Sequence, residues 1–304
     1  LEFCGKRLAA PIWMSAITGG IEEAIPFNLD LATLAEEFGI PFCLGSMKPM
    51  LKDASRTQDY QVRQVAPTTL VMGNIGATEL VASGPKPMLE ALKTIEADGL
   101  CIHLNPAMEL TQPGGDADFT GVVGAMANLL TAAPDLPVVV KETGCGLSFQ
   151  DGKALQKIGV KSVEVAGAGG TSWIGVETLR ASDRQARLGA MLWDWGIPTA
   201  VSTSWLSQQG FDVVAAGGIR NGLDMARALA LGARLTGIAA PLVRAYYTDF
   251  GGIEAVRAYL TDLVEGLRSV LLVCGVDRPQ KMSTVPKVLG PDLARWINAA
   301  SASE

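Results

Sequence analysis

The sequence predicts a (β/α)8 TIM barrel, an α/β fold, in a single domain that spans residues 1–304. Eight short apolar runs recur along the chain, mostly at intervals of roughly 25 to 35 residues, which is the repeat length of the βα units in this fold. Amphipathic stretches of helical length separate several of the runs. Because the runs are apolar at nearly every position, they suit parallel strands that are buried on both faces. A doubly wound open sheet is the structural alternative, but it uses fewer strands in a chain of this length.

The expected strands are residues 11–16, 41–45, 69–74, 99–104, 137–141, 162–167, 212–217 and 235–240. The clearest expected helices are residues 30–38, 86–97, 151–158 and 221–231, where apolar residues recur at helical spacing. Gly and polar residues follow the strands, as in "SAITGG", "HLN" and "KETGCG". Active sites of TIM barrels lie at the carboxyl ends of the strands. We therefore expect the functional site at that end of the barrel.

The composition excludes several classes of protein. Hydrophobic residues make up 48% of the chain, which is enough for a sizeable core. The net charge is -6 and no basic run occurs, so nucleic acid is not an expected partner. The five cysteines show no C-x-x-C spacing, which favours a reduced, cytoplasmic setting over a zinc site or a disulfide framework. No membrane span and no signal peptide are expected, because the apolar stretches are short and interrupted.

Two late strand ends are suited to bind a phosphate. The segments "GAGGT" (167–171) and "GGIR" (217–220) offer backbone N–H groups without obstruction by side chains. The second segment opens the expected helix 221–231, and both the helix start and Arg220 favour an anion. Glycine also serves tight turns alone. Two such turns on neighbouring late strands nevertheless favour a phosphate site.

Two further polar residues stand at strand ends. Lys141 closes the apolar run "PVVV" and is expected at the barrel rim. Beside a flavin its ammonium would stabilise negative charge on the reduced ring, and without a cofactor it is a candidate Schiff-base nucleophile. An ion pair with a neighbouring Glu is the purely structural alternative. Asn74 offers a donor and an acceptor that suit the polar edge of a ring.

The only histidine, His103, stands in "IHLNPAMELTQPGGDADF" (102–119), with Asn105 and Glu109 within the next six residues. A histidine that is satisfied inside the core is the structural alternative. The nearby amide and carboxylate instead favour contact with a ligand. A single carboxylate such as Glu109 makes a weak Mg²⁺ site until the phosphate of a substrate completes it.

Taken in order, the strand ends resemble one family, the FMN-dependent type 2 isopentenyl-diphosphate isomerases. The resembling motifs extend over essentially the whole chain. They are "LAAPIWMSAITGG", "LGSMK", "NIGA", "HLNPAMELTQPGGDADF", "VVVKETGCG", "VAGAGGTSW", "WGIPTA" and "GGIRNGLDMARALALGA". The resemblance implies an enzyme of isoprenoid biosynthesis that moves a double bond, converting isopentenyl to dimethylallyl diphosphate with reduced FMN and Mg²⁺.

The resemblance also implies roles for single residues. The positions that match FMN contacts are Ala16, Ile17, Thr18, Ser46, Asn74, Lys141, Thr171, Gly218, Ile219, Arg220, Ala239 and Ala240. The positions that match contacts with the substrate diphosphate are His103, Asn105, Thr143 and Arg180, and Glu109 matches the Mg²⁺ ligand. His103, Lys141 and position 108 are the candidate catalytic positions. NAD(P)H or another reductant would reduce the FMN, and the family commonly forms homo-oligomers, as tetramers or octamers.

The sequence departs from the family pattern at three places. Met108 stands where the family carries Gln, and a thioether cannot donate a hydrogen bond. Lys48 replaces the usual Arg. It keeps the positive charge but lacks the planar guanidinium group, which can donate two parallel hydrogen bonds. A segment with an Arg-Lys pair, which precedes the barrel in the family, is expected to be missing here.

These departures leave three functional hypotheses. The first is isomerisation of isopentenyl diphosphate or a related prenyl (di)phosphate, with Met108 widening the pocket or altering the proton route. The second is an FMN-dependent oxidoreductase of the 2-hydroxy-acid oxidase type, although that class usually carries its His on a later strand. The third is an FMN-binding barrel that lacks isomerase activity because Met108 replaces the Gln.

Overall fold

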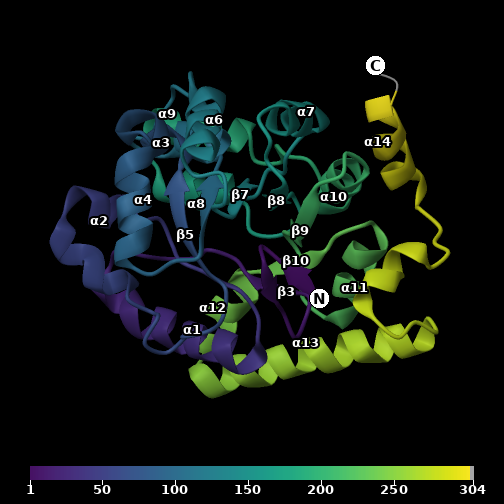
Figure 1. Cartoon of the computed structure of the whole chain (residues 1–304). Helices are drawn as coiled ribbons and strands as arrows, with labels where there is room; N and C mark the ends of the chain where they lie inside the picture. The colour runs from purple at the N-terminus through teal and green to yellow at the C-terminus, as the bar shows by residue number, and fades with distance from the viewer. Residues whose placement is uncertain (302–304) are drawn as a thin grey trace.

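The computed structural model describes residues 1–301, so the end of the predicted domain, 302–304, lies outside the described residues. Eight parallel strands form a closed barrel in the order β10-β3-β4-β5-β6-β7-β8-β9 (Figure 1). The strands are β3 (Ile12–Met14), β4 (Phe42–Cys43), β5 (Val71–Gly76), β6 (Gly99–His103), β7 (Val138–Lys141), β8 (Ser162–Glu164), β9 (Asp212–Ala216) and β10 (Leu235–Ile238). The prediction of a TIM barrel is confirmed. Each expected run contains one barrel strand, except that β5 extends to Gly76 because it pairs with His103.

Helices surround the barrel (Figure 1). The four expected helices correspond to α1 (Ile25–Phe38), α4 (Pro85–Thr94), α7 (Phe149–Lys157) and α11 (Gly222–Ala230). The other longer helices are α6 (Val122–Ala132), α9 (Asp183–Met191), α10 (Thr199–Gln208), α13 (Ile253–Val273) and α14 (Pro291–Ser301). Short helices α2 (Lys48–Lys52), α3 (Ala77–Ser83), α5 (Pro106–Thr111), α8 (Trp173–Arg180) and α12 (Ala240–Tyr246) follow strand ends, and η1 (Glu22–Ala24), η2 (Ala54–Tyr60) and η3 (Pro279–Thr284) are 3-10 turns.

Local sequence explains where some of these helices begin. Ser148 caps α7: its Oγ accepts the N–H of Asp151 at 3.0 Å, and the Asp151 carboxylate accepts the N–H of Ser148 at 2.7 Å. This reciprocal pair satisfies two backbone donors that a helix start leaves free. Asn221 caps α11 with its side-chain oxygen alone, which accepts the N–H of Asp224 at 2.9 Å. The cap places the amino end of α11 directly behind the second Gly-rich turn.

The barrel interior changes character along its axis. Its lower part is apolar, with Trp13, Cys43, Met72, Cys101, Val139, Val214 and Leu235 in one buried cluster. Because side chains alternate along a strand, residues two positions later point into the same interior. Three of these later residues are Asn74, His103 and Lys141, all polar. The interior is therefore apolar at the amino ends of the strands and polar at the carboxyl ends, where the site was expected.

A short hairpin closes the amino end of the barrel. Strands β1 (Glu2–Phe3) and β2 (Lys6–Arg7) pair antiparallel. The turn between them uses left-handed backbone at Cys4 (φ 49°) and Gly5 (φ 75°). Phe3 packs edge-on against Trp13, with ring centroids 5.5 Å apart. The hairpin thus seals the apolar part of the interior, a role that the sequence reasoning did not predict.

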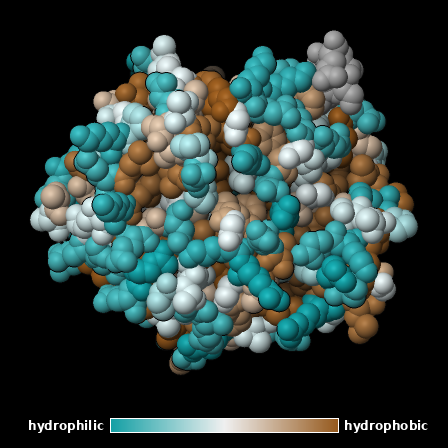
Figure 2. All heavy atoms as spheres, viewed as in Figure 1, coloured by the Kyte–Doolittle hydropathy of each residue, from teal (hydrophilic) through white to brown (hydrophobic). Residues whose placement is uncertain are grey.

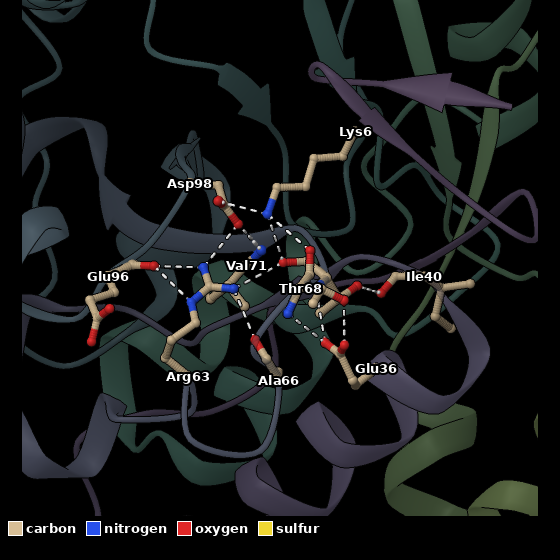
Figure 3. Close-up of polar contacts among 10 residues, drawn as sticks. Lys6, Glu36, Ile40, Arg63, Ala66, Thr68, Val71, Glu96 and Asp98 are labelled. Carbon is tan, nitrogen blue, oxygen red and sulfur yellow. Dashed lines mark hydrogen bonds and ion pairs between the residues drawn. The ribbon is translucent and has the colours of Figure 1, made fainter.

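Ion pairs hold this hairpin against the strand starts (Figure 3). Lys6 Nζ lies 2.8 Å from an oxygen of Asp98, and Arg63 lies 2.9 Å from the other oxygen. Arg63 also donates to the backbone oxygens of Ala66 and Glu96. The Asp98 carboxylate accepts the N–H of Val71 at the start of β5. One carboxylate therefore joins the hairpin to β5 and to the loop before it.

The outer surface is mixed in character. Hydrophilic residues are interspersed with smaller hydrophobic areas on the face shown in Figure 2.

At the carboxyl end of the chain, α14 packs on α10: Trp205 donates its indole N–H to Ile297 O at 3.3 Å. Among the described residues, no helix combines the length and the apolar character that crossing a membrane requires.

Candidate functional site

The polar group at the carboxyl ends of the strands is built by strand register. His103 on β6 pairs with Lys141 on β7, and Lys141 pairs with Glu164 on β8. Lys141 is 5% exposed. Its Nζ donates to Glu142 O at 2.7 Å and lies 3.9 Å from Glu164 Oε2. The structural expectation for Lys141, an ion pair with a neighbouring Glu, is therefore met in the interior of the barrel.

Glu164 is a site residue that the sequence reasoning missed. Its side chain is buried with 1% exposure, and its Oε2 accepts the indole N–H of Trp13 at 3.2 Å. Its Oε1 is buried and has no hydrogen-bond partner among the described residues. The signal was present as one carboxylate inside the apolar run "SVEVAG". Buried carboxylates are rare unless they are paired. Glu164 within this apolar run therefore indicated a partner in the barrel interior.

His103 contacts Asn74 from the neighbouring strand. Its Nδ1 lies 3.1 Å from Asn74 Oδ1. Burial, together with the charges of Lys141 and Lys48, lowers the pKa of His103 to about 3. The ring is therefore neutral at physiological pH. Since an amide oxygen can only accept, Nδ1 carries the hydrogen and Nε2 keeps its lone pair.

Asn105 and Glu109 lie together at the start of α5. Asn105 Nδ2 donates to Glu109 Oε1 at 2.8 Å, and the other Glu109 oxygen accepts the N–H of Asp116 at 2.9 Å. The thioether sulfur of Met108 lies 3.8 Å from Asn105 Nδ2. The structure thus brings together the amide, the carboxylate and the divergent methionine of the stretch 102–119. No cluster of three or more potential metal-binding His, Cys, Asp or Glu residues is present in the described part of the chain.

Lys48 approaches this group from α2. Its Nζ lies 2.8 Å from Glu79 and 3.9 Å from Asp116. Asp116 also accepts the hydroxyl of Thr78 at 2.9 Å. The hydrogen bond with Glu79 raises the pKa of Lys48, which keeps its charge at the rim. This charge is one of the two that disfavour protonation of His103.

The two Gly-rich turns converge, as a phosphate site requires. A Cβ built on Gly170 would lie 2.9 Å from Gly217 Cα, and one on Gly218 would lie 2.5 Å from Gly169 O. Any side chain larger than hydrogen would therefore fill the space between the turns. Arg220 joins the two turns, because Nη2 donates to Gly169 O and Nη1 to Gly218 O, each at 3.0 Å.

Thr199 at the start of α10 supports these turns and was also missed. Its hydroxyl donates to Gly217 O at 2.7 Å. The backbone N–H of Thr199 donates to Ala168 O at 3.1 Å, so the same residue contacts both turns. The motif "WGIPTA" contains this threonine, but the contact depends on tertiary structure.

Comparison with known proteins decides the family. The chain is 38% identical over 300 residues to the isopentenyl-diphosphate delta-isomerase of Methanothermobacter thermautotrophicus, covering 98% of this chain and 83% of that protein. It is 37% identical over 307 residues to the isopentenyl-diphosphate delta-isomerase of Pyrococcus furiosus, covering 98% and 77%. The chain belongs to the type 2 isopentenyl-diphosphate delta-isomerase family. The predictions of this family and of an isomerase are confirmed.

The cofactor class and the fold are supported by two further comparisons. Residues 125–286 match the FMN-dependent dehydrogenase family. The fold is similar to that of a mandelate oxidase variant with an FMN adduct, with a TM-score of 0.64 and 17% identity, covering 95% of this chain and 83% of that one. Mandelate oxidase with (S)-2-phenylpropionate gives a TM-score of 0.62 at 16% identity, covering 95% and 81%. At such identity the likeness concerns the fold alone.

The residues at the rim fit an FMN of this isomerase family. The converging turns leave a space that a Cβ would fill, and Lys141 supplies a buried positive charge on β7, which pairs with the β8 strand that leads into the first turn. The expected FMN positions lie within or after the ends of seven strands. They are Ala16, Ile17 and Thr18 after β3, Ser46 after β4, Asn74 in β5, Lys141 in β7, Thr171 after β8, Gly218, Ile219 and Arg220 after β9, and Ala239 and Ala240 after β10.

Two expected diphosphate positions of the family pattern occupy different settings. Thr143 follows β7, and its N–H donates to Glu142 Oε2 at 2.6 Å. Burial raises the pKa of Glu142 to about 7, although its hydrogen bonds from backbone N–H groups oppose that shift. Arg180 ends α8, where its side chain is 71% exposed and lies 3.6 Å from the Glu177 carboxylate. Thr143 is therefore next to Lys141, whereas the guanidinium of Arg180 faces solvent.

Proposed function

We propose that this protein isomerises isopentenyl diphosphate to dimethylallyl diphosphate, or moves the same bond in a related prenyl (di)phosphate, by flavin-assisted proton transfer with FMN and Mg²⁺. The observation that carries the proposal is the register of β6 and β7, which sets His103 and the buried Lys141 side by side at the rim. The two converging turns lie around the same rim and suit the FMN phosphate. Family membership is the second support.

The reaction adds a proton to the terminal methylene carbon and removes one from the carbon next to the oxygen-bearing carbon, so the double bond moves without net oxidation. Reduced FMN supplies an acid–base group for these transfers when it is bound. The ammonium of Lys141, which is buried at the rim, would stabilise negative charge on that cofactor. The neutral His103 would accept, at Nε2, a hydrogen bond from a protonated oxygen of the diphosphate.

Glu109 is the proposed ligand of Mg²⁺. Its carboxylate is already oriented by Asn105 and by the N–H of Asp116. Mg²⁺ is usually bound by one or two carboxylates together with substrate phosphates and water, so the substrate diphosphate would complete this site. Asn105 and Thr143 would then face the diphosphate from neighbouring loops, with the exposed Arg180 farther along α8.

The test is turnover by anaerobic protein that carries reduced FMN and Mg²⁺, with the flavin spectrum followed at the same time. The proposal predicts many turnovers of isopentenyl diphosphate while the flavin stays reduced. An oxidoreductase of the 2-hydroxy-acid oxidase type would instead change the flavin's redox state in each turnover. NAD(P)H or dithionite serves as the reductant before substrate is added.

A second candidate function is an FMN-binding barrel without isomerase activity. The contact that favours it is the one at Met108, whose sulfur lies 3.8 Å from Asn105 Nδ2 in the position of the family's Gln. A thioether accepts a hydrogen bond weakly and donates none. Loss of one positioned polar group costs on the order of a hundredfold in rate. This candidate gains support if no C5 to C15 prenyl diphosphate is turned over.

We also propose that the chain forms a homo-oligomer in the cytoplasm. The support is three exposed apolar side chains on or just after the contacting helices α8 and α9: Leu179, Met191 and Trp195 are 80%, 72% and 65% exposed. Exposed apolar groups of this size mark interaction surfaces in many proteins. Light scattering of the purified protein tests this part, and a monomer at micromolar concentration contradicts it.

A further inference from the structure

Glu164 stands directly behind Lys141 in the barrel, and the proposed reaction gives it no role. It comes from β8, whereas Lys141 comes from β7, and the two residues pair in register. Their side chains are buried, with exposures of 1% and 5%. One oxygen of Glu164 accepts from Trp13, and the other has no hydrogen-bond partner among the described residues. A buried carboxylate with one oxygen that lacks a hydrogen-bond partner requires a physical explanation.

Charge compensation explains the burial. A lone ammonium or a lone carboxylate in an apolar interior is costly, whereas the two together offset much of that cost. The neighbouring Glu142 is not the partner, because its carboxylate turns to the N–H groups of Thr143 and Cys145 at 2.6 Å. Glu164 is therefore the carboxylate that faces the Lys141 ammonium.

Trp13 sets the distance within this pair. Its indole N–H donates at 3.2 Å to Oε2, which is the same oxygen that lies 3.9 Å from Lys141 Nζ. At that separation the charges attract, but Nζ makes no direct hydrogen bond to the carboxylate. One N–H of Lys141 goes to Glu142 O. Its remaining N–H groups stay available to a ligand at the rim.

We propose that Glu164, held by Trp13, is a positioning residue that partly compensates the charge of Lys141 at the rim and so sets the reduction potential of the bound FMN. This inference rests on the proposed function only for the presence of FMN. Reduced flavin carries a negative charge that the oxidised ring lacks. A compensated Lys141 stabilises that charge less than an uncompensated one would.

Three variants test the inference through the midpoint potential of FMN. Glu164→Gln leaves Lys141 uncompensated, so the affinity of reduced relative to oxidised FMN should rise about tenfold, a shift of about 30 mV upward for two electrons. Lys141→Met leaves Glu164 uncompensated and should shift the potential downward. The double variant removes both charges and should return toward the wild-type potential. Glu90→Gln is the matched control, because Glu90 is 67% exposed on α4, and it should leave the potential unchanged.

The inference is overturned if Glu164→Gln leaves the midpoint potential unchanged or lowers it. It is also overturned if the potential of the double variant does not return toward the wild-type value. Trp13→Phe is a further variant that keeps the ring and removes the N–H. It frees Glu164 to approach Lys141 and should lower the potential, and an unchanged potential would contradict the role of Trp13.

Urea unfolding without added FMN separates this inference from the proposed function. Each single variant leaves one buried charge unpaired and should lower the unfolding midpoint, whereas the double variant should recover part of the loss. Additive losses without recovery would refute the pairing. If the protein binds no FMN but shows this recovery, the proposed function fails while the Lys141–Glu164 pair stands.

Discussion

Asn74 and His103 contact each other inside the barrel, with Asn74 Oδ1 3.1 Å from His103 Nδ1. They come from the adjacent strands β5 and β6. The contact places the hydrogen of the neutral ring on Nδ1 and directs an acceptor nitrogen to the other side. A Cβ on Gly76 would lie 3.3 Å from Nε2, so the glycine leaves room beside that nitrogen.

This arrangement predicts the state of His103 in solution. Because the pKa of His103 is lowered to about 3, the ring should stay neutral and not titrate between about pH 5 and 9. Nitrogen-15 NMR of the imidazole reports the tautomer without assignment work, since the chain has a single histidine. The spectrum should show hydrogen on Nδ1.

The variant Asn74→Leu removes the acceptor and should release the preference for that tautomer. Asn221, which caps α11 away from the ring, gives a control in Asn221→Asp, and this change should leave the imidazole spectrum as it was. Titration of the wild-type ring near its ordinary pKa, or hydrogen on Nε2, would refute the account of His103.

Asp98 at the opposite end of the barrel predicts sensitivity to acid. Burial alone would raise the pKa of Asp98, but hydrogen bonds from Lys6, the N–H of Val71 and Arg63 outweigh it and lower the pKa below the ordinary 3.8. Ionised Asp98 therefore contributes stability above about pH 4 that is lost as the pH falls through the lowered value. Buried neutral His103 acts in the same direction, because the unfolded chain binds a proton there first.

The variant Asp98→Asn should lower the free energy of unfolding by about 1 to 3 kcal/mol at neutral pH and weaken its acid dependence. Urea unfolding at several pH values measures both effects. Asp292→Asn is the control, because this side chain is 91% exposed and should change little. Equal pH profiles for Asp98→Asn and wild type would contradict the assignment.

A substitution at Gly218 tests whether the two Gly-rich turns, 167–171 and 217–220, hold the FMN phosphate. This residue has a φ of 89°, and a Cβ there would lie 2.5 Å from Gly169 O. The variant Gly218→Ala should weaken FMN binding by tenfold or more, since the turns must separate. Gly210 offers a close control, with a φ of 87° and no atom within 4 Å of a built Cβ.

Gly210→Ala should therefore lose stability through backbone strain alone and keep its FMN affinity. Fluorescence titration with FMN and thermal unfolding measure the two quantities separately. Equal FMN affinities for the two variants would show that the two Gly-rich turns do not hold the phosphate.

Substitution of Met108 tests how the rate of substrate turnover responds to one added polar group. The variant Met108→Gln places an amide next to Asn105 and should raise the rate of isopentenyl diphosphate isomerisation by about tenfold to a hundredfold. Met108→Leu, which is apolar and of similar size, controls for packing. If only Met108→Gln is active, the parent is a binding protein. If Met108→Gln is no faster than wild type, the thioether is not the limiting group.

Much of the site was predictable, because barrel strands appear as apolar runs and functional residues stand at their ends. Lys141 and His103 both follow such runs, and the convergent turns appear as repeated glycines. Glu164 and Trp13 lie within their runs, and the hydrogen bond between them crosses the barrel interior between strands that do not pair. The hairpin β1–β2 has strands of two residues, too short for any periodic signal.

The most direct test of the central claim is anaerobic turnover of isopentenyl diphosphate in D₂O by protein that carries reduced FMN and Mg²⁺, followed by NMR. The account predicts dimethylallyl diphosphate in large excess over flavin, with deuterium in the methyl group formed from the terminal methylene. Protein that binds FMN but forms no product from this or any longer prenyl diphosphate, or forms product without deuterium, would contradict it.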